Sequence, residues 1–140
     1  MTKIKFFVEL PDIPRTTHQQ RGVKIVNGRP MFYTKDKVQE VKDLYTLLLR
    51  THRPKQPLAG ALRLIVKFYY PVKRPHKDGE PKTTRPDTDN MIKLLKDVAT
   101  ACGYWIDDAQ IADERVIKAY SDPSGIWFEV EQIGRGGVPI

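Results

Sequence analysis

The sequence has 140 residues, of which 40% are hydrophobic, so it can form one compact core but leaves little room for two domains. Its 24 Lys and Arg residues outnumber its 17 Asp and Glu residues, and the formal net charge of +7 favours a polyanionic partner, because such cations release counterions when they neutralise phosphates. A single cysteine, Cys102, excludes an intrachain disulfide and a zinc site built from thiolates, whereas the charge alone does not exclude a basic protein that binds nothing in particular.

The N-terminal part is expected to be rich in β-structure. Apolar side chains recur at every second position of residues 3–10, which predicts a strand. Residues 23–26 and 30–33 flank Asn27 and Gly28, a pair that readily adopts the positive φ angles of a tight turn. This pattern predicts a β-hairpin.

The next element is predicted to be a helix over residues 35–51, capped by Thr34. Its apolar positions have helical spacing, which is more typical of a core than of a binding surface: Val38, Val41, Leu44, Tyr45 and Leu48. Cations at its end suit the helix dipole as well as they would suit a phosphate: Arg50, His52, Arg53 and Lys55.

The middle of the chain combines a buried strand with an irregular segment. A strand is predicted within residues 58–70, with these side chains on one face: Leu62, Leu64, Val66 and Phe68. Residues 71–86 contain four prolines and five cations, so we expect an irregular loop. Loops of this length are often either disordered or functional.

The C-terminal part begins with a second predicted helix, over residues 88–101, which Gly103 is placed to end. Its apolar positions follow a helical repeat: Met91, Ile92, Leu95, Val98, Ala99 and Cys102. On this apolar side Cys102 is expected to be a structural thiol rather than a nucleophile. Residues 111–120 and 126–133 predict two strands, joined by a turn.

The order of these elements predicts an α/β (α+β) fold, with one domain over residues 1–133. Two α-helices are expected to pack on one face of a mixed β-sheet. Residues 134–140 carry three glycines and are expected to form a flexible tail. The longest apolar segment, 62–72, contains Arg63 and Lys67 and is too short to span a bilayer. We recognise no signal peptide and expect a soluble, cytoplasmic protein.

An acidic segment at the start of the second helix is the most informative part of the sequence. Asp87 and Asp89 are two positions apart where the chain is still extended, so both project to one side. Lys93 lies one helical turn after Asp89 on the polar face. For one aspartate, a helix cap or a surface salt bridge would be the simplest interpretation. A second acidic pair, Asp107 and Asp108, follows the same helix, and a cap or salt bridge at the helix start does not account for it.

Clustered carboxylates repel one another and raise each other's pKa unless a cation lies among them. Such a cluster in a basic, phosphate-seeking protein therefore predicts a bound metal. Hard oxygen ligands suit Mg²⁺, which lowers the pKa of a bound water and stabilises charge on phosphorus, and the sequence leaves one or two metals per site open. His18, His52 and His76 lack the spacing of zinc ligands.

Two segments at these acids resemble the RusA family of Holliday junction resolvases. The first reads Arg-Pro-Asp-Thr-Asp-Asn over residues 85–90, with Lys93 in the helix that follows. The second reads Gly-Tyr-Trp-Ile-Asp-Asp-Ala-Gln over residues 103–110. The family's pattern is Asp-x-Asp-Asn, a lysine four residues after the second aspartate, and a Gly-aromatic-aromatic-x-Asp-Asp-x-Gln segment. Both halves and their spacing are present, and Val116 and Lys118 resemble the family's following strand.

The resemblance implies a crossover junction endodeoxyribonuclease that hydrolyses phosphodiester bonds symmetrically in Holliday junctions, in DNA recombination and repair. It implies a homodimer, which suits the approximate two-fold symmetry of a four-way junction, and dependence on Mg²⁺, with Mn²⁺ as a substitute. Carried over by position, the catalytic metal ligands are Asp87, Asp89 and Asp108, and Asp107 is a candidate fourth acid. Lys93 is implied to be the catalytic lysine, and we expect it to stabilise charge on the scissile phosphate or the leaving oxygen.

Cations in and around the proline-rich loop are the candidate DNA contacts: Lys73, Arg74, Lys77, Lys82 and Arg85, with Arg15 and Arg21. Each of them is equally compatible with a solvated surface charge. Three alternatives stay open: a non-catalytic structure-specific DNA-binding protein, a broader metal-dependent nuclease of branched DNA or RNA, and a basic structural protein. The intact acidic set favours a nuclease.

Overall fold

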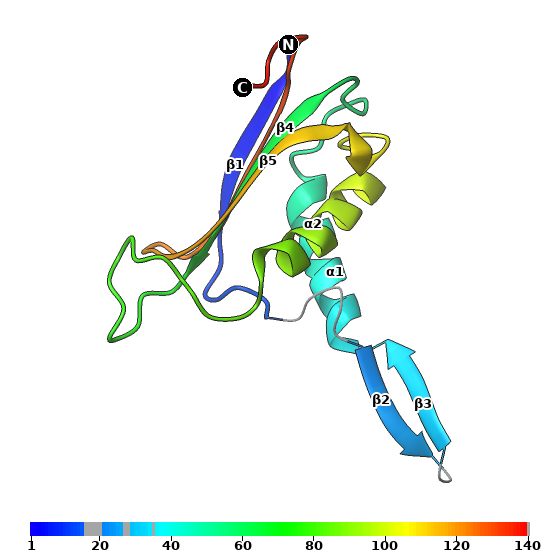
Figure 1. Ribbon diagram of the computed structural model, residues 1–140, viewed down its shortest axis with the longest axis vertical. Coiled ribbons are helices and arrows are strands. Elements are labelled where there is room, and N and C mark those ends of the chain that lie inside the picture. The colour runs from blue at the N-terminus through cyan, green and yellow to red at the C-terminus, as the bar shows by residue number, and fades with distance from the viewer. Residues whose placement is uncertain (16–20, 27–28, 35, 140) are drawn as a thin grey trace.

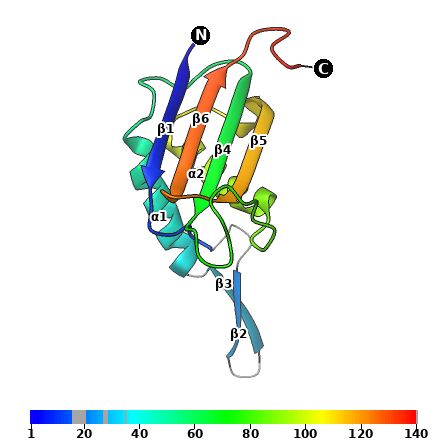
Figure 2. The same cartoon turned by 90° about the vertical axis from the view of Figure 1, so that its left-hand side faces the viewer.

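The computed structural model describes residues 1–15, 21–26, 29–34 and 36–139, and for residues 21–26, 29–34 and 36 the description is limited to the backbone. The main layer is a four-stranded sheet in the order β1-β6-β4-β5, and α1 and α2 cover one of its faces (Figures 1 and 2). The elements in chain order are β1 Lys3–Glu9, β2 Arg21–Val26, β3 Arg29–Thr34, α1 Asp36–Arg50, β4 Leu62–Tyr70, α2 Thr88–Cys102, η1 Asp108–Gln110, β5 Ile111–Tyr120 and β6 Gly125–Gln132. This arrangement confirms the predicted α+β fold with a mixed sheet and two helices on one face.

Strand β4 occupies the centre of the sheet, where it pairs parallel with β5 and antiparallel with β6. Every second residue faces the helices and is at most 1% exposed: Leu62, Leu64, Val66, Phe68 and Tyr70. The intervening residues are half-buried on the opposite face. This alternation confirms the predicted strand. Burial of each large apolar side chain contributes about 1.5–3 kcal/mol to stability.

Helix α1 packs its apolar stripe against α2 and the sheet. The predicted stripe is buried at Val38, Val41 and Tyr45, and its other members, Leu44 and Leu48, are half-buried. Leu48 packs against the core, and Leu49, which was not predicted, is buried in it. The helix begins at Asp36, so the predicted capping by Thr34 involves side chains that lie outside the described ones.

Helix α2 is the element that carries the acidic segment. Its predicted stripe is buried at Met91, Ile92, Leu95, Val98 and Ala99, and Leu94, which was not part of that prediction, is buried with them. Gly103 ends the helix in the left-handed region, with φ 88°, as its position predicted. Cys102 is half-buried, and burial raises the pKa of its thiol, which favours a structural role over a nucleophilic one.

Strands β2 and β3 form a separate two-stranded sheet, with Val26 opposite Arg29. This confirms the predicted hairpin, although Asn27 and Gly28 themselves lie outside the described residues. Figures 1 and 2 show the hairpin extending away from the main sheet, at the end of the molecule where α1 begins.

The proline-rich loop is fastened to the edge of the sheet at the end of β5. The Gly79 amide donates to the Tyr120 carbonyl at 2.7 Å, and the Tyr120 amide donates to the Glu80 carbonyl at 2.9 Å. The Lys82 amide then donates to the Lys118 carbonyl at 3.0 Å. The loop is therefore more ordered than its prolines and charges predicted, and these bonds guide the chain into the start of α2.

The segment after β6 returns to the sheet, where Arg63 Nη2 donates to the Gly137 carbonyl at 2.6 Å. The domain boundary after residue 133 and the flexibility of the tail remain predictions. Within the described residues, no helix has both the length and the apolar character that crossing a membrane requires.

Candidate acidic site

Asp87 and Asp89 lie at the N-terminus of α2. Asp87 is the N-cap residue, with φ −73° and ψ 148°, but its side chain makes no capping hydrogen bond. Asp89 lies in the first helical turn, and both residues are exposed. The negative charges are favoured there by the helix dipole. The Asp87 carboxylate is thus not committed to capping the helix, so its oxygens are open to a ligand from solvent.

The second acidic pair follows an anchored aromatic turn. Tyr104 and Trp105 are fully buried. The Tyr104 hydroxyl donates to the Leu49 carbonyl at 2.5 Å, and Trp105 Nε1 donates to Thr100 Oγ1 at 2.7 Å. These bonds fix the backbone just before the two aspartates, so the packing of the core determines where Asp107 and Asp108 lie.

Asp107 and Gln110 form a capping box around the short helix η1. Asp107 Oδ1 accepts from the Ala109 amide at 2.9 Å, and Gln110 Oε1 accepts from the Asp107 amide at 3.1 Å. Gln110 Nε2 donates to the Leu58 carbonyl at 2.9 Å. Asp107 and Gln110 therefore stabilise η1. The sequence alone did not distinguish the capping role of Asp107 from the role of the adjacent Asp108.

Lys93 joins the two halves of the acidic motif. Its Nζ donates to Asp97 Oδ1 at 3.0 Å and lies 3.6 Å from Asp108 Oδ2. The hydrogen bond to Asp97 is the largest cause of a raised Lys93 pKa, so the ammonium stays charged at neutral pH. Lys93 lies one helical turn from both Asp89 and Asp97, and the structure pairs it with Asp97. Sequence reasoning missed Asp97, although four residues is the ordinary spacing of a helical ion pair.

The donor set of this region suits a divalent metal such as Mg²⁺, which prefers carboxylate oxygens and retained waters. Asp87 and Asp89 come from the start of α2, and Asp108 comes from η1 beside Lys93. In the part of the chain that the structure describes, no three His, Cys, Asp or Glu side chains lie close enough together to hold a metal ion. The carboxylate donors are chemically suited to a metal ion. That the three aspartates come together around one ion stays a prediction.

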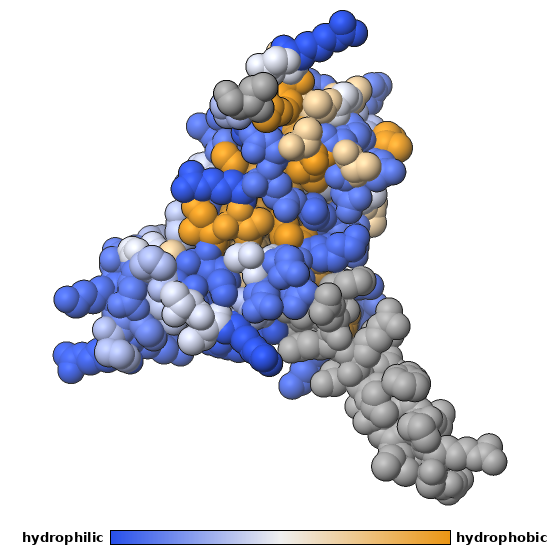
Figure 3. All heavy atoms as spheres, viewed as in Figure 1, coloured by the Kyte–Doolittle hydropathy of each residue, from blue (hydrophilic) through white to orange (hydrophobic). Residues whose placement is uncertain are grey.

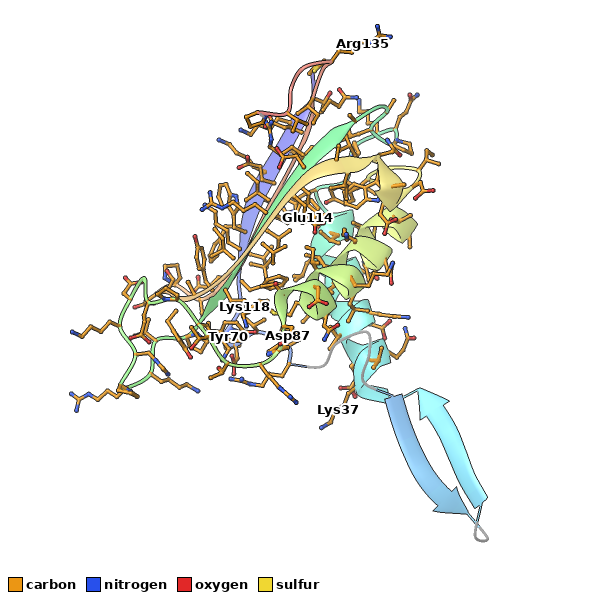
Figure 4. All side chains as sticks on the ribbon, viewed as in Figure 1. Lys37, Tyr70, Asp87, Glu114, Lys118 and Arg135 are labelled. Carbon is orange, nitrogen blue, oxygen red and sulfur yellow. The ribbon has the colours of Figure 1, made fainter. Side chains whose placement is uncertain are left out.

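A half-buried lysine, Lys118, lies close to Asp87. Figure 4 shows Lys118 close to Tyr70 and Asp87, near the segment that leads into α2. Burial lowers the pKa of Lys118 and Lys82 lowers it further, whereas Asp87 acts in the opposite direction. Lys118 therefore places a positive charge near Asp87, and a nearby opposite charge favours the ionised carboxylate.

The predicted DNA contacts divide into exposed and buried cations. Five are exposed: Arg15, Lys73, Arg74, Lys77 and Arg85. The end of the molecule that carries the loop is hydrophilic in Figure 3. Lys82 is only 8% exposed, and its ammonium lies 4.7 Å from the centre of the Tyr70 ring. Lys82 is therefore poorly placed to contact DNA, unlike the five exposed cations. The Arg21 side chain lies outside the described ones.

The described histidines have aromatic partners. His52 stacks on Phe6 and His76 stacks on Tyr120, each with ring centroids 4.0 Å apart. His76 also hydrogen-bonds Glu80. These contacts give both rings a structural role, and His18 lies outside the described residues.

Comparison with known proteins agrees with the motif. The family model of endodeoxyribonuclease RusA matches residues 12–131. The chain is 33% identical over 135 residues to "Crossover junction endodeoxyribonuclease rusA" of Lactococcus phage r1t, covering 94% of this chain and 99% of that protein. It is 28% identical over 131 residues to "Uncharacterized protein YqaN" of Bacillus subtilis (strain 168), covering 86% and 91% of the two chains. A shorter match to "Crossover junction endodeoxyribonuclease RusA" of Escherichia coli (strain K12) is 47% identical over 38 residues, which cover 27% of this chain and 32% of that protein.

Proposed function

Because the chain belongs to the RusA family of endodeoxyribonucleases, we propose that it resolves Holliday junctions by cutting phosphodiester bonds at symmetric positions in two strands. Its activity is that of a crossover junction endodeoxyribonuclease, a hydrolase that depends on a divalent metal. We assign that metal as Mg²⁺, with Mn²⁺ as a substitute, and we place the reaction in DNA recombination and repair.

The contact between Lys93 and Asp108 is the observation that carries this proposal. It joins the polar face of α2 to η1, which are the two segments that hold the acidic motif. Asp87 and Asp89 begin the same helix with exposed carboxylates. A surface that combines several acids with a charged lysine, in a protein of net charge +7, is suited to a metal and a phosphate.

We assign Asp87, Asp89 and Asp108 to metal binding. When bound, the metal supplies an activated water and stabilises charge on phosphorus. Asp107 is assigned to the capping of η1, since its Oδ1 already accepts from a backbone amide. Lys93 keeps its proton and acts electrostatically, on the scissile phosphate or on the leaving oxygen.

A homodimer is part of the proposal. A four-way junction has approximate two-fold symmetry, so a two-fold dimer presents one acidic site to each of two strands. Two sites in one particle explain symmetric cuts without the protein having to rebind. Sedimentation of the free protein, together with the pairing of nicks in one junction, tests this part separately from catalysis.

Cleavage of a synthetic four-way junction tests the proposed function. Wild-type protein with Mg²⁺ is expected to produce paired, symmetric nicks, and removal of the metal with a chelator is expected to stop cleavage while the junction stays bound. Binding without any nick would favour the non-catalytic DNA-binding alternative. Comparable nicking of linear duplex, flaps or RNA would favour the broader nuclease.

The exposed loop cations are expected to control the salt dependence of junction binding. Each phosphate contact contributes about 0.9 to the slope of log affinity against log salt. The triple variant Lys73→Gln, Arg74→Gln, Lys77→Gln should therefore bind more weakly and reduce that slope by up to about 2.7 units. Binding is measured by fluorescence anisotropy in Ca²⁺ at several salt concentrations.

A matched triple variant controls for net charge. Lys5→Gln, Lys37→Gln and Arg135→Gln remove the same charge from exposed positions outside the loop. This control should keep most of the wild-type slope. Equal slopes for the two triple variants would show that the loop makes no special phosphate contacts.

A further inference from the structure

Two lysines lie on the inner side of the segment that leads into the acidic site. Lys82 belongs to the loop and Lys118 to β5, on the face that the helices cover. Lys82 is the buried charged residue of the described part of the chain, with 8% of its surface exposed. Removing an ammonium from water costs free energy unless hydrogen bonds replace its hydration. The groups that contact the Lys82 ammonium therefore indicate its structural role.

Lys118 binds the backbone immediately before Asp87. Its Nζ donates to the Thr84 carbonyl and to the Pro86 carbonyl, both at 2.7 Å. Two carbonyls from one turn of loop converge on a single ammonium, which has three donors to offer. This contact fixes the last loop residues before α2, and Asp87 is the next residue.

Lys82 holds the same segment from a second side. Its Nζ donates to Thr84 Oγ1 at 2.5 Å and lies over the rings of Tyr70 and Tyr120, 4.7 and 5.6 Å from their centroids. Its amide donates to the Lys118 carbonyl at 3.0 Å. Thr84 is therefore held by its hydroxyl and by its carbonyl. We call Lys82 and Lys118 together the lysine clamp.

The directions of these contacts separate the clamp from the DNA-binding cations. Both ammonium groups are occupied by loop oxygens or ring faces. Exposed cations of the same loop, such as Lys73 and Lys77, point to solvent instead. The clamp thus binds the protein's own loop, and one of the groups that it binds, the Pro86 carbonyl, belongs to the residue directly before Asp87.

We propose that Lys118 is a positioning residue for the nuclease reaction: by binding the Thr84 and Pro86 carbonyls, it sets the direction in which Asp87 enters the metal site, with Lys82 holding Thr84 in place. This inference rests on the proposed function for the role of Asp87. Its physical basis is that a carboxylate on an exposed N-cap has freedom of direction unless the residues before it are fixed, and metal binding is sensitive to such outer contacts.

The test uses Lys118→Met in the full chain, compared with Lys118→Arg. Methionine keeps an unbranched stem that ends where the Lys118 ammonium begins, so both carbonyls lose their donor. Hydrogen exchange of the metal-free protein is expected to rise in peptides covering residues 83–91 and to stay unchanged in β4. The Mg²⁺ concentration for half-maximal junction cleavage should increase about 10- to 100-fold, as for other outer contacts of a metal site, with partial rescue by arginine.

A calorimetric titration with Mn²⁺ gives a readout that does not depend on cleavage, and the Mn²⁺ affinity of Lys118→Met should fall by the same factor. Lys67→Met is the matched control, because Lys67 is a half-buried strand lysine over the Trp127 ring, outside the clamp. It should leave exchange of residues 83–91 and the metal requirement unchanged. Thr84→Ala, at an exposed residue, removes the hydroxyl that Lys82 binds and should raise exchange of the same segment without altering a buried charge.

Wild-type exchange over residues 83–91 in Lys118→Met, or an unchanged metal requirement, would overturn the inference. A rise in exchange across the whole chain, with a loss of cleavage at every Mg²⁺ concentration, would also overturn it, because Lys118 would then serve general stability alone. Failure of the wild-type protein to cut junctions is a different result, since it refutes the proposed function while exchange still reports on the clamp.

Discussion

Asp108→Asn is expected to reduce junction cleavage by about a thousandfold or more, whereas Asp107→Asn is expected to stay within about threefold of wild type. A metal stabilises transition-state charge by several kcal/mol, and about 4 kcal/mol corresponds to a thousandfold in rate. Asn at position 108 removes the charge that faces Lys93, 3.6 Å away. Asn at position 107 still accepts a hydrogen bond from the Ala109 amide and still caps η1.

The two variants are matched in size, charge and sequence position, so each controls for the other. Single-turnover cleavage of a four-way junction in saturating Mg²⁺ gives the rate, and binding in Ca²⁺ shows whether the protein still recognises its substrate. Binding of Asp108→Asn should be normal or stronger, because a negative charge facing phosphate has been removed. Equal losses of cleavage in the two variants would contradict the assignment of Asp107 to structure and Asp108 to metal.

The sequence predicted most of the fold because its strongest signals are local. The alternation in β4 follows from the geometry of a strand, and the apolar stripe in α2 follows from the geometry of a helix. The apolar face of each element is buried as expected. The predicted α1 stripe missed one buried residue at its end, Leu49, which packs in the core beside the half-buried Leu48. A helix drifts around its axis with each turn, so its last buried position depends on the neighbour that it meets, which local sequence does not specify.

The parts that were missed all depend on contacts between distant segments. Lys82 reads as one more loop cation, and its burial follows only from the pairing of the loop with the end of β5. The division of labour between Asp107 and Asp108 depends on the placement of Ala109 and Lys93. The sequence pattern predicted the acidic residues as one group. The structure shows that their neighbours differ, since Asp107 caps η1 and Asp108 lies beside Lys93.

The charge pattern of the site has a consistent physical meaning. Acids alone would repel a phosphate, and cations alone would bind it without activating a nucleophile. Here Lys93 faces Asp108 on one side of α2, and Lys118 binds the Pro86 carbonyl directly before Asp87 and interacts electrostatically with that acid. Each lysine limits the repulsion among carboxylates while the exposed faces of Asp87 and Asp89 stay available.

Lys93→Met is expected to reduce junction cleavage by about 10²- to 10³-fold, the loss that follows removal of one preorganised charge or donor at a reacting group. Junction binding in Ca²⁺ should change little, and Lys93→Arg should recover part of the rate because it restores the positive charge. Lys96→Met is the matched control on the same helix, since Lys96 is a half-buried lysine that pairs with Glu114 at 2.9 Å and should be dispensable for cleavage.

The pH dependence decides which role Lys93 has. Its contacts with Asp97 and Asp108 raise its pKa, so Lys93 remains protonated throughout the range in which cleavage is measured. The ratio of wild-type to Lys93→Met rates should therefore be constant between about pH 6 and pH 9, well below the ordinary lysine pKa. If Lys93 acted as a general base, wild type would lose its advantage as the pH falls, because the neutral amine would become scarcer. A constant ratio requires a fixed positive charge, which is the role that the geometry around Asp108 supports.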